Sequence, residues 1–118
     1  MDKIDRQQLN QLVFIEMTSE EKIIDHLLEL YQEQVAKYAP LIESESEGCN
    51  LDKVSHMAHS LKSSAANLGM IAVEQICLHI ETESKKNHQI NYRELVEKIR
   101  LESEQALVQI RAFLTDQK

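Results

Sequence analysis

The chain has 118 residues with 20 acidic and 13 basic side chains, which gives a formal net charge of −7. This excess of acid argues against a nucleic-acid-binding protein, because such proteins neutralise phosphates with clustered Lys and Arg. The chain contains two Gly and one Pro, whereas sheet proteins need turn residues about every ten positions. An all-β fold is therefore excluded, and the length indicates one domain, residues 1–118.

The sequence also lacks the features of a membrane or secreted protein. A membrane span takes about 18 apolar residues, and the apolar run from Leu12 to Ile15 stops after four. The amino terminus has no apolar stretch after a positive start, so it is not a secretory signal. Cys49 and Cys77 form no C-x-x-C motif, and we interpret them as reduced thiols. We therefore expect a cytoplasmic protein with no membrane partner.

Capping residues and apolar spacing predict five helical segments. Asp5 is placed to begin the first, with Ile4 and Leu9 on either side of it as a hydrophobic staple. Thr18 and Glu21 have the spacing of a capping box and predict the start of the second. The second segment carries an apolar stripe at helical spacing, formed by Ile24, Leu27, Leu28, Tyr31, Val35, Tyr38 and Ile42.

The second and third segments meet near the middle of the chain. Pro40 removes a backbone hydrogen bond and crowds the carbonyl of Ala36, so we expect a bend there. Helical periodicity is lost over residues 43–47, and Gly48 is placed to end the helix. Asn50 is placed to cap the third segment. The core stripe of the third segment is Val54, Ala58, Leu61, Ala65 and Leu68, and the segment stops at Gly69.

Two further segments complete the predicted fold. The fourth covers about residues 70–86, and Asn91 and Glu94 form a capping box at the start of the fifth, stapled by Ile90 and Leu95. The apolar face of the fourth is Val73, Ile76, Cys77 and Ile80, and that of the fifth includes Ile99, Ala106, Ile110 and Phe113. Four amphipathic helices with short links close into a bundle. We predict an all-α fold, an antiparallel four-helix bundle with a short additional N-terminal helix across one end.

The third segment carries a histidine on its predicted solvent face. Projected at 100° per residue, Val54, Met57, Leu61 and Leu68 lie about 160° to 220° away from His59. The residues within about 60° of it are Ser55, His56, Lys62, Ser63 and Ala66. Three of these five are small, although an ordinary surface helix presents long charged side chains. This helix face is therefore open to a bulky partner.

An exposed imidazole next to a lysine is suited to carrying a phosphoryl group. An unperturbed imidazole has a pKa of about 6.5, so much of it is neutral and nucleophilic at neutral pH. Lys62 would counterbalance an anion on the ring of His59. At about 4 Å this attraction is worth about 1 kcal/mol in water and about 4 kcal/mol at an interface-like dielectric. The alternative is an ordinary surface histidine in a structural bundle.

Residues 58–69 resemble the motif of histidine-containing phosphotransfer (HPt) domains of two-component phosphorelays. The family pattern reads His-x-Leu-Lys-Gly, then small residues and a later Gly. This chain reads Ala-His-Ser-Leu-Lys-Ser-Ser-Ala-Ala-Asn-Leu-Gly. Residues 77–81, Cys-Leu-His-Ile-Glu, look like the family's Cys-x-x-Leu-Glu segment. The chain departs from the pattern at Ser63, where many members have Gly.

The resemblance implies a phosphocarrier that accepts a phosphoryl group from a receiver-domain aspartate and passes it to another receiver domain. It implies that His59 is the phosphoacceptor, that Lys62 is its charge partner and that Gly69 allows close packing at the turn. The partner-docking residues expected around the histidine are Ser55, His56, Ser63 and Ala66. The expected partners are the receiver domains of a hybrid histidine kinase and of a response regulator, and we expect a free-standing monomer.

The remaining motif searches favour a carrier over an enzyme. No Gly-rich phosphate loop and no nucleophile elbow occur in the sequence, so we expect no ATP site and no enzymatic activity of its own. We expect no cofactor, since a Mg²⁺ ion would belong to the partner receiver domain. His56 is placed to share a metal with His59, but the sequence offers no third ligand. The alternative function is a helical adaptor bundle that binds partners without being phosphorylated.

Overall fold

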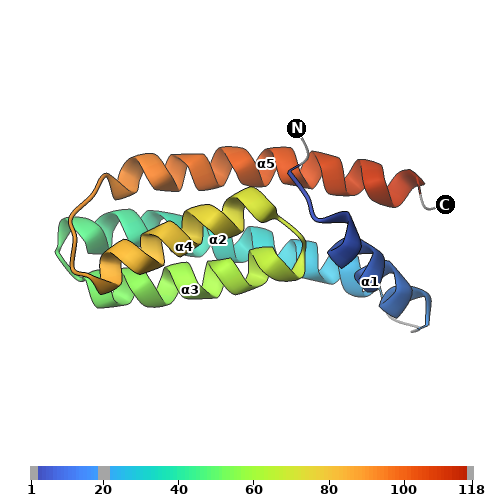
Figure 1. The fold of residues 1–118 in the computed structure, drawn as a ribbon, viewed down its shortest axis with the longest axis horizontal. Coiled ribbons are helices and arrows are strands. Elements are labelled where there is room, and N and C mark those ends of the chain that lie inside the picture. The colour runs from blue at the N-terminus through green and yellow to red at the C-terminus, as the bar shows by residue number, and fades with distance from the viewer. Residues whose placement is uncertain (1–2, 19–21, 117–118) are drawn as a thin grey trace.

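The computed structural model of the protein describes residues 3–18 and 22–116. Its helices are α1 (Arg6–Met17), α2 (Ile23–Glu47), α3 (Leu51–Asn67), α4 (Ile71–Lys85) and α5 (Tyr92–Asp116). Figure 1 shows α2 to α5 running up and down along the long axis of the molecule, each antiparallel to the one before it in the chain. The short α1 lies at one end, beside the start of α2. The predicted all-α bundle with an additional N-terminal helix is confirmed.

The predicted apolar stripes form the core of the bundle. The whole stripe predicted for the third segment is buried: Val54, Ala58, Leu61 and Ala65 in α3, and Leu68 at its C-cap. In α5 the predicted face is buried as well: Ile99, Ala106, Ile110 and Phe113. Helix α3 packs most closely against α4, whose Val73, Cys77 and Ile80 are fully buried. This packing places α4 along one flank of the histidine-bearing helix.

The N-terminal segment ties α1 to the start of α4. Asp5 caps α1 as predicted, since its carboxylate accepts hydrogen bonds from the backbone N–H groups of Gln7 and Gln8 at 3.1 and 3.2 Å. Ile4, before the cap, is buried and forms an isolated β-bridge with Met70, the residue before α4. The segment thus joins two helices that are far apart in the sequence.

The start of α2 differs from the prediction. Thr18 stands at the end of α1, and its hydroxyl donates to two carbonyl groups in the last turn of that helix. Helix α2 begins only at Ile23. Glu21, the second residue of the predicted capping box, lies outside the described residues. Instead, the carboxylate of Glu16 accepts a hydrogen bond from the backbone N–H of Ile24 at 3.1 Å. A side chain of the preceding helix therefore satisfies a free N–H group of α2.

The turn between α2 and α3 lies where it was predicted, but its backbone conformation and capping contacts differ from the prediction. The chain stays helical through Pro40 and through residues 43–47, and Gly48 is the C-cap of α2 as predicted. The left-handed residue in this turn is Cys49, with a φ of 61°. Asn50 is the N-cap of α3, but its side chain makes no cap hydrogen bond and donates to a carboxylate of α2 instead.

Half of the capping box predicted for α5 is present, and Glu94 returns a bond to the side chain of Asn91. The side-chain oxygen of Asn91 accepts a hydrogen bond from the backbone N–H of Glu94 at 3.1 Å. The side-chain nitrogen of Asn91 donates to the carboxylate of Glu94 at 3.3 Å. Ile90 and Leu95, the predicted staple, both pack against the core. These contacts define the first turn of α5.

The turn between α3 and α4 requires a glycine. Gly69 has a φ of 70°, in the left-handed region that other residues seldom adopt. Its carbonyl accepts a hydrogen bond from the N–H of Asp5 at 2.6 Å. A Cβ atom at this position would lie 2.8 Å from the carbonyl oxygen of Asp5. Because Gly69 has no side chain, the N-terminal segment can pack directly against this turn.

Replacing Gly69 with Ala should lower the free energy of unfolding by about 2 kcal/mol or more, because Ala must adopt a left-handed backbone and meets Asp5. Gly48→Ala is the matched control, since Gly48 has a φ of −81° and its nearest neighbour would lie 3.4 Å from the new Cβ. This control should be neutral or gain up to about 1 kcal/mol. Urea unfolding followed by circular dichroism measures both. Equal losses in the two variants would contradict the role of the turn.

Candidate functional site

His59 lies on the outer face of α3, as the helical projection predicts. Its side chain is 61% exposed. The ring nitrogen Nδ1 lies 2.6 Å from the carboxylate oxygen Oε2 of Glu81, on α4. Within the part of the chain that the structure describes, the other ring nitrogen, Nε2, makes no hydrogen bond. The ring is therefore held at one nitrogen and open at the other.

The contact with Glu81 determines which nitrogen of His59 is nucleophilic. An ionised carboxylate only accepts hydrogen bonds, so Nδ1 carries the hydrogen and donates it. In the neutral ring the lone pair is then on Nε2. Nε2 is therefore the nitrogen that can attack an electrophile.

Glu81 is the buried centre of the site. The residue is 4% exposed, and its second oxygen, Oε1, accepts a hydrogen bond from Nζ of Lys62 at 2.6 Å. Nζ of Lys85 lies 3.8 Å from Oε2. Burial raises the pKa of Glu81, but the hydrogen bonds from Lys62 and His59 outweigh burial and hold this pKa below its ordinary value. The carboxylate is therefore ionised at neutral pH.

Lys62 contacts a carboxylate that the sequence analysis did not assign to it. Its side chain is 23% exposed and its ammonium group is bonded to Glu81. Lys62 thus acts on His59 through the carboxylate that both residues share. An ammonium group in such a pair supports the charged form of its partner.

The sequence analysis did not single out Glu81 as a site residue. A signal was nevertheless present, because Glu81 lies on the face of α4 that also carries Cys77, Ile80 and Ser84, all of which are buried. A carboxylate on a core-facing helix surface needs a partner, since charged groups are almost never buried unpaired. The identity of the partners was not predictable from α4 alone.

The four predicted docking residues differ in exposure. His56 and Ser63 are exposed, and Ala66 is partly exposed. Ser55 is 5% exposed, so the expectation that it belongs to the exposed surface is wrong. Glu81 and Lys85 of α4 border the same depression as Ser55, and α4 covers this flank of α3. His56 is bonded to its own helix, with Nδ1 2.7 Å from the carbonyl oxygen of Asp52.

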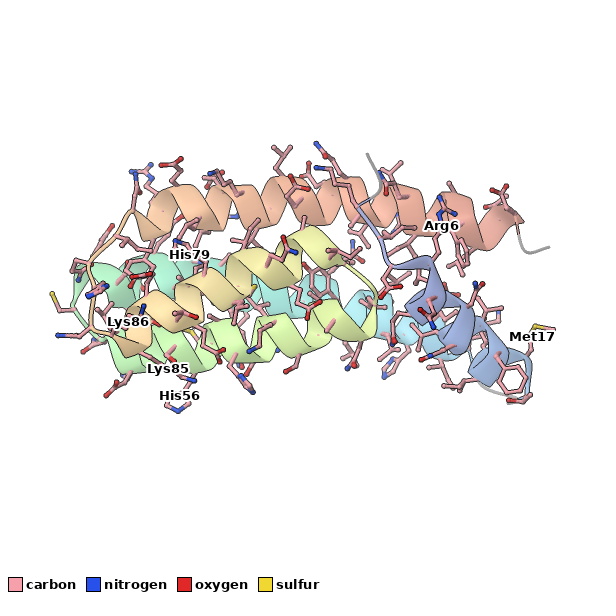
Figure 2. All side chains as sticks on the ribbon, in the orientation of Figure 1. Arg6, Met17, His56, His79, Lys85 and Lys86 are labelled. Carbon is pink, nitrogen blue, oxygen red and sulfur yellow. The ribbon has the colours of Figure 1, made fainter. Side chains whose placement is uncertain are left out.

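The depression beside the histidine joins α3 and α4. It is lined by Asp52, Ser55, His56, His59, Glu81 and Lys85. Figure 2 shows His56 and Lys85 on the same side of the bundle. Among the described residues, no group of three or more His, Cys, Asp or Glu side chains is arranged to hold a metal ion. The lining of the depression thus combines two imidazoles and one lysine with two carboxylates.

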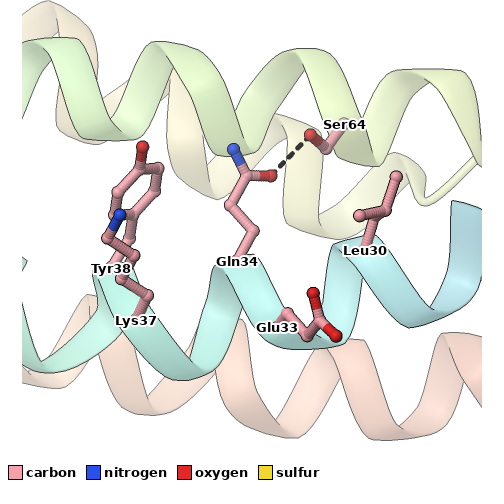
Figure 3. A pocket seen from close by; sticks show the side chains of 6 residues that line it. All are labelled: Leu30, Glu33, Gln34, Lys37, Tyr38 and Ser64. Atoms are coloured by element: carbon pink, nitrogen blue, oxygen red, sulfur yellow. Dashed lines mark hydrogen bonds between the residues drawn. The ribbon is translucent and has the colours of Figure 1, made fainter.

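A second depression lies between α2 and α3 and is shown in Figure 3. It is lined by Leu30, Glu33, Gln34, Lys37, Tyr38 and Ser64. The hydroxyl of Ser64 donates to the side-chain oxygen of Gln34 at 2.5 Å. The lining includes neither a histidine nor a cysteine, so the candidate site is the first depression.

One known protein-family model matches most of the chain. The model of the Hpt domain family matches residues 26–116, which include all three members of the His59, Lys62 and Glu81 cluster. The chain belongs to the Hpt domain family. Comparison with curated proteins found no match, and comparison with solved structures found none. Hpt domains act in phosphotransfer within phosphorelays and interact there with receiver domains, and the chain shares this general role.

The Hpt match leaves α1 outside its range, since it begins within α2. Helix α1 nevertheless contributes the buried residues Leu9 and Leu12 to the core. In the described parts of this Hpt domain, no helix combines the length and the apolar character that a membrane-spanning segment needs.

Replacing Glu81 with Gln should lower the free energy of unfolding at pH 7 by about 1–3 kcal/mol, because Lys62 loses the anion that it pairs with. The pKa of Glu81 is lowered in the folded state. Its ionisation therefore stabilises the fold above the ordinary glutamate pKa, and this contribution is lost as the pH falls through the lower, folded-state pKa.

The stability difference between the wild type and Glu81→Gln should accordingly shrink as the pH is lowered from 7 to below 4. Urea unfolding across this range measures it. Glu104→Gln is the matched control, because Glu104 is exposed on α5, and its effect should stay within about 0.5 kcal/mol. A Glu81 effect that stays constant with pH would contradict the ionised pairing.

Proposed function

We propose that this Hpt domain accepts a phosphoryl group on Nε2 of His59 from the phosphoaspartate of one receiver domain and passes it to an aspartate of another. The observation that carries the proposal is the bond from Nδ1 of His59 to the buried carboxylate of Glu81, which leaves the lone pair on Nε2. We further propose that the two receiver domains belong to a hybrid histidine kinase and to a response regulator.

The transfer step balances without a proton leaving the ring. The lone pair of Nε2 attacks the phosphorus of the aspartyl phosphate, so that an N–P bond forms and the bond between phosphorus and the aspartate oxygen breaks. The aspartate departs as a carboxylate. His59 keeps the hydrogen on Nδ1 and becomes a phosphorylated imidazolium, whose positive charge the neighbouring carboxylate of Glu81 stabilises. In the second transfer, an aspartate oxygen of the next receiver attacks the phosphorus, the N–P bond breaks, and the lone pair returns to Nε2.

Two further features support this proposal. Lys62 is bonded to Glu81 and maintains its negative charge, so the ring stays oriented for attack. Ser63 and Ala66 are small residues that are exposed or partly exposed on the same helix. A receiver domain needs such a surface, because its aspartyl phosphate must come within bonding distance of the ring. Any Mg²⁺ ion needed for the reaction would be held by the receiver.

The proposal is tested by incubating the protein with purified receiver domains that have been charged with acetyl phosphate and Mg²⁺. Intact mass spectrometry should show a gain of one phosphoryl group that is labile to acid and stable to base, as expected for phosphohistidine. Stable binding of a charged receiver without any gain in mass would contradict phosphotransfer. That result would favour the adaptor function.

Replacing His59 with Gln should abolish uptake of the phosphoryl group and leave the helical fold intact, because the side chain faces away from the core. His56→Gln is the matched control, since His56 is also an exposed histidine of α3, and it should retain uptake. Mass spectrometry measures the label, and circular dichroism measures the fold. Full labelling of the His59→Gln variant, at His56 or elsewhere, would contradict the assignment.

Placing a charge on the surface around His59 should block the approach of a receiver domain. We expect Ser63→Glu and Ala66→Arg to slow transfer from a charged receiver at least about tenfold, because a bulky charge is desolvated against the partner. Direct phosphorylation by the small donor phosphoramidate should change much less.

Gln105→Glu, at an exposed position on α5, is the control for added charge and should leave both rates unchanged. The comparison uses initial rates with the receiver and with phosphoramidate for each variant. Unchanged receiver rates in both α3 variants would show that partners dock elsewhere on the protein.

A further inference from the structure

The depression beside His59 contains a lysine that the sequence pattern did not assign. Lys85 is in the last turn of α4, and its side chain is 66% exposed. Its ammonium group lies 3.8 Å from Oε2 of Glu81, the same oxygen that accepts from the ring of His59 at 2.6 Å. Because both groups approach one oxygen atom, the ammonium group and the ring are neighbours. Lys85 also lines the depression together with His59.

The two lysines of the site are held very differently. Lys62 is bonded to Glu81 at 2.6 Å, is 23% exposed and is not among the residues that line the depression. Moving Lys62 onto another anion would leave the buried carboxylate without its closest cation, which is unfavourable. Lys85 is at a longer distance and in contact with solvent, where an ion pair contributes little. Lys85 can therefore leave Glu81 at low cost.

The charges around the depression create a need for such a cation. Its titratable lining residues are Asp52, His56, His59, Glu81 and Lys85. Among the described residues of this lining, Lys85 is the one lysine, and no arginine is present. A phosphoryl group on His59 would bring negative charge close to Asp52 and Glu81, and like charges repel. The flexible four-carbon stem of a lysine allows the ammonium group to turn from Glu81 to the new anion.

We propose that Lys85 is the residue that pairs with the phosphoryl group on His59, while Lys62 keeps Glu81 in place. This inference rests on the proposed function and assigns a contact within the same site. In the unphosphorylated protein Lys85 lies beside Glu81. After transfer its ammonium group contacts the phosphoryl oxygens and stabilises their charge, so the phosphorylated state lasts longer and forms in higher yield.

The test compares Lys85→Gln with Lys62→Gln and with the matched control Lys86→Gln, which removes the same charge from the next, exposed residue. The phosphorylated proteins are prepared with phosphoramidate or with a charged receiver domain. Titration by ³¹P NMR then gives the pKa of the phosphoryl group. A nearby cation favours the dianion, so Lys85→Gln should raise this pKa by at least about half a pH unit. Lys86→Gln should leave it unchanged.

A second measurement separates the roles of the two lysines before any transfer. In the unphosphorylated protein, Lys62→Gln should change the ¹⁵N chemical shifts of the His59 ring, because Glu81 loses its closest cation. Lys85→Gln should leave those chemical shifts close to the wild type. If Lys85 had only a structural role, replacing it would alter the unphosphorylated ring as well. A change confined to the phosphoryl pKa therefore indicates direct contact with the phosphoryl group.

The outcomes distinguish this inference from the proposed function. If the wild-type protein takes up no phosphoryl group from either donor, the proposed function fails and the inference fails with it. If the wild type is phosphorylated but Lys85→Gln and Lys86→Gln give the same phosphoryl pKa, the inference alone is overturned. A rise of this pKa in Lys62→Gln alone would assign the contact to Lys62.

Discussion

The site depends on a single buried carboxylate shared between two helices. Glu81 of α4 accepts from His59 through one oxygen and from Lys62 through the other, both at 2.6 Å. Taking a carboxylate out of water is unfavourable unless such partners replace the lost hydration. Helices α3 and α4 must therefore stay in one register, because a shift by one residue would separate Glu81 from both partners. The pairing of Glu81 therefore orients the reactive ring and also holds the two helices together.

The packing of α3 on α4 maintains this register. Small side chains at Ala58 and Ala65 line the buried face of α3 and allow a close approach of the two helices. Cys77 is buried on the opposing helix, and burial raises the pKa of its thiol to about 12. It therefore remains protonated and serves as a small apolar side chain. Gly69 forms the turn from α3 to α4, and its lack of a side chain leaves room for the backbone of Asp5.

Features encoded within one helix were predictable from the sequence, and features that depend on two helices were not. Asp5, Asn91 and the buried stripe of α3 follow from local capping and periodicity, and so does the exposure of His59. The capping pattern at Thr18 failed because its hydroxyl bonds back to the preceding helix. Ser55 was misplaced because projecting one helix does not reveal a neighbour on its flank. Glu81 was missed because its partners lie 19 and 22 residues away in the sequence.

The N-terminal segment, residues 3–5, determines how far the protein can be shortened for expression. The family match begins at residue 26, and a fragment trimmed to that boundary would lack the backbone partner of Gly69. It would also lack Lys3, which is bonded to Glu102 on α5. The trimmed fragment would uncover Met70, a fully buried side chain directly before α4. A domain border drawn from shared sequence alone would thus open the end of the bundle where α4 starts.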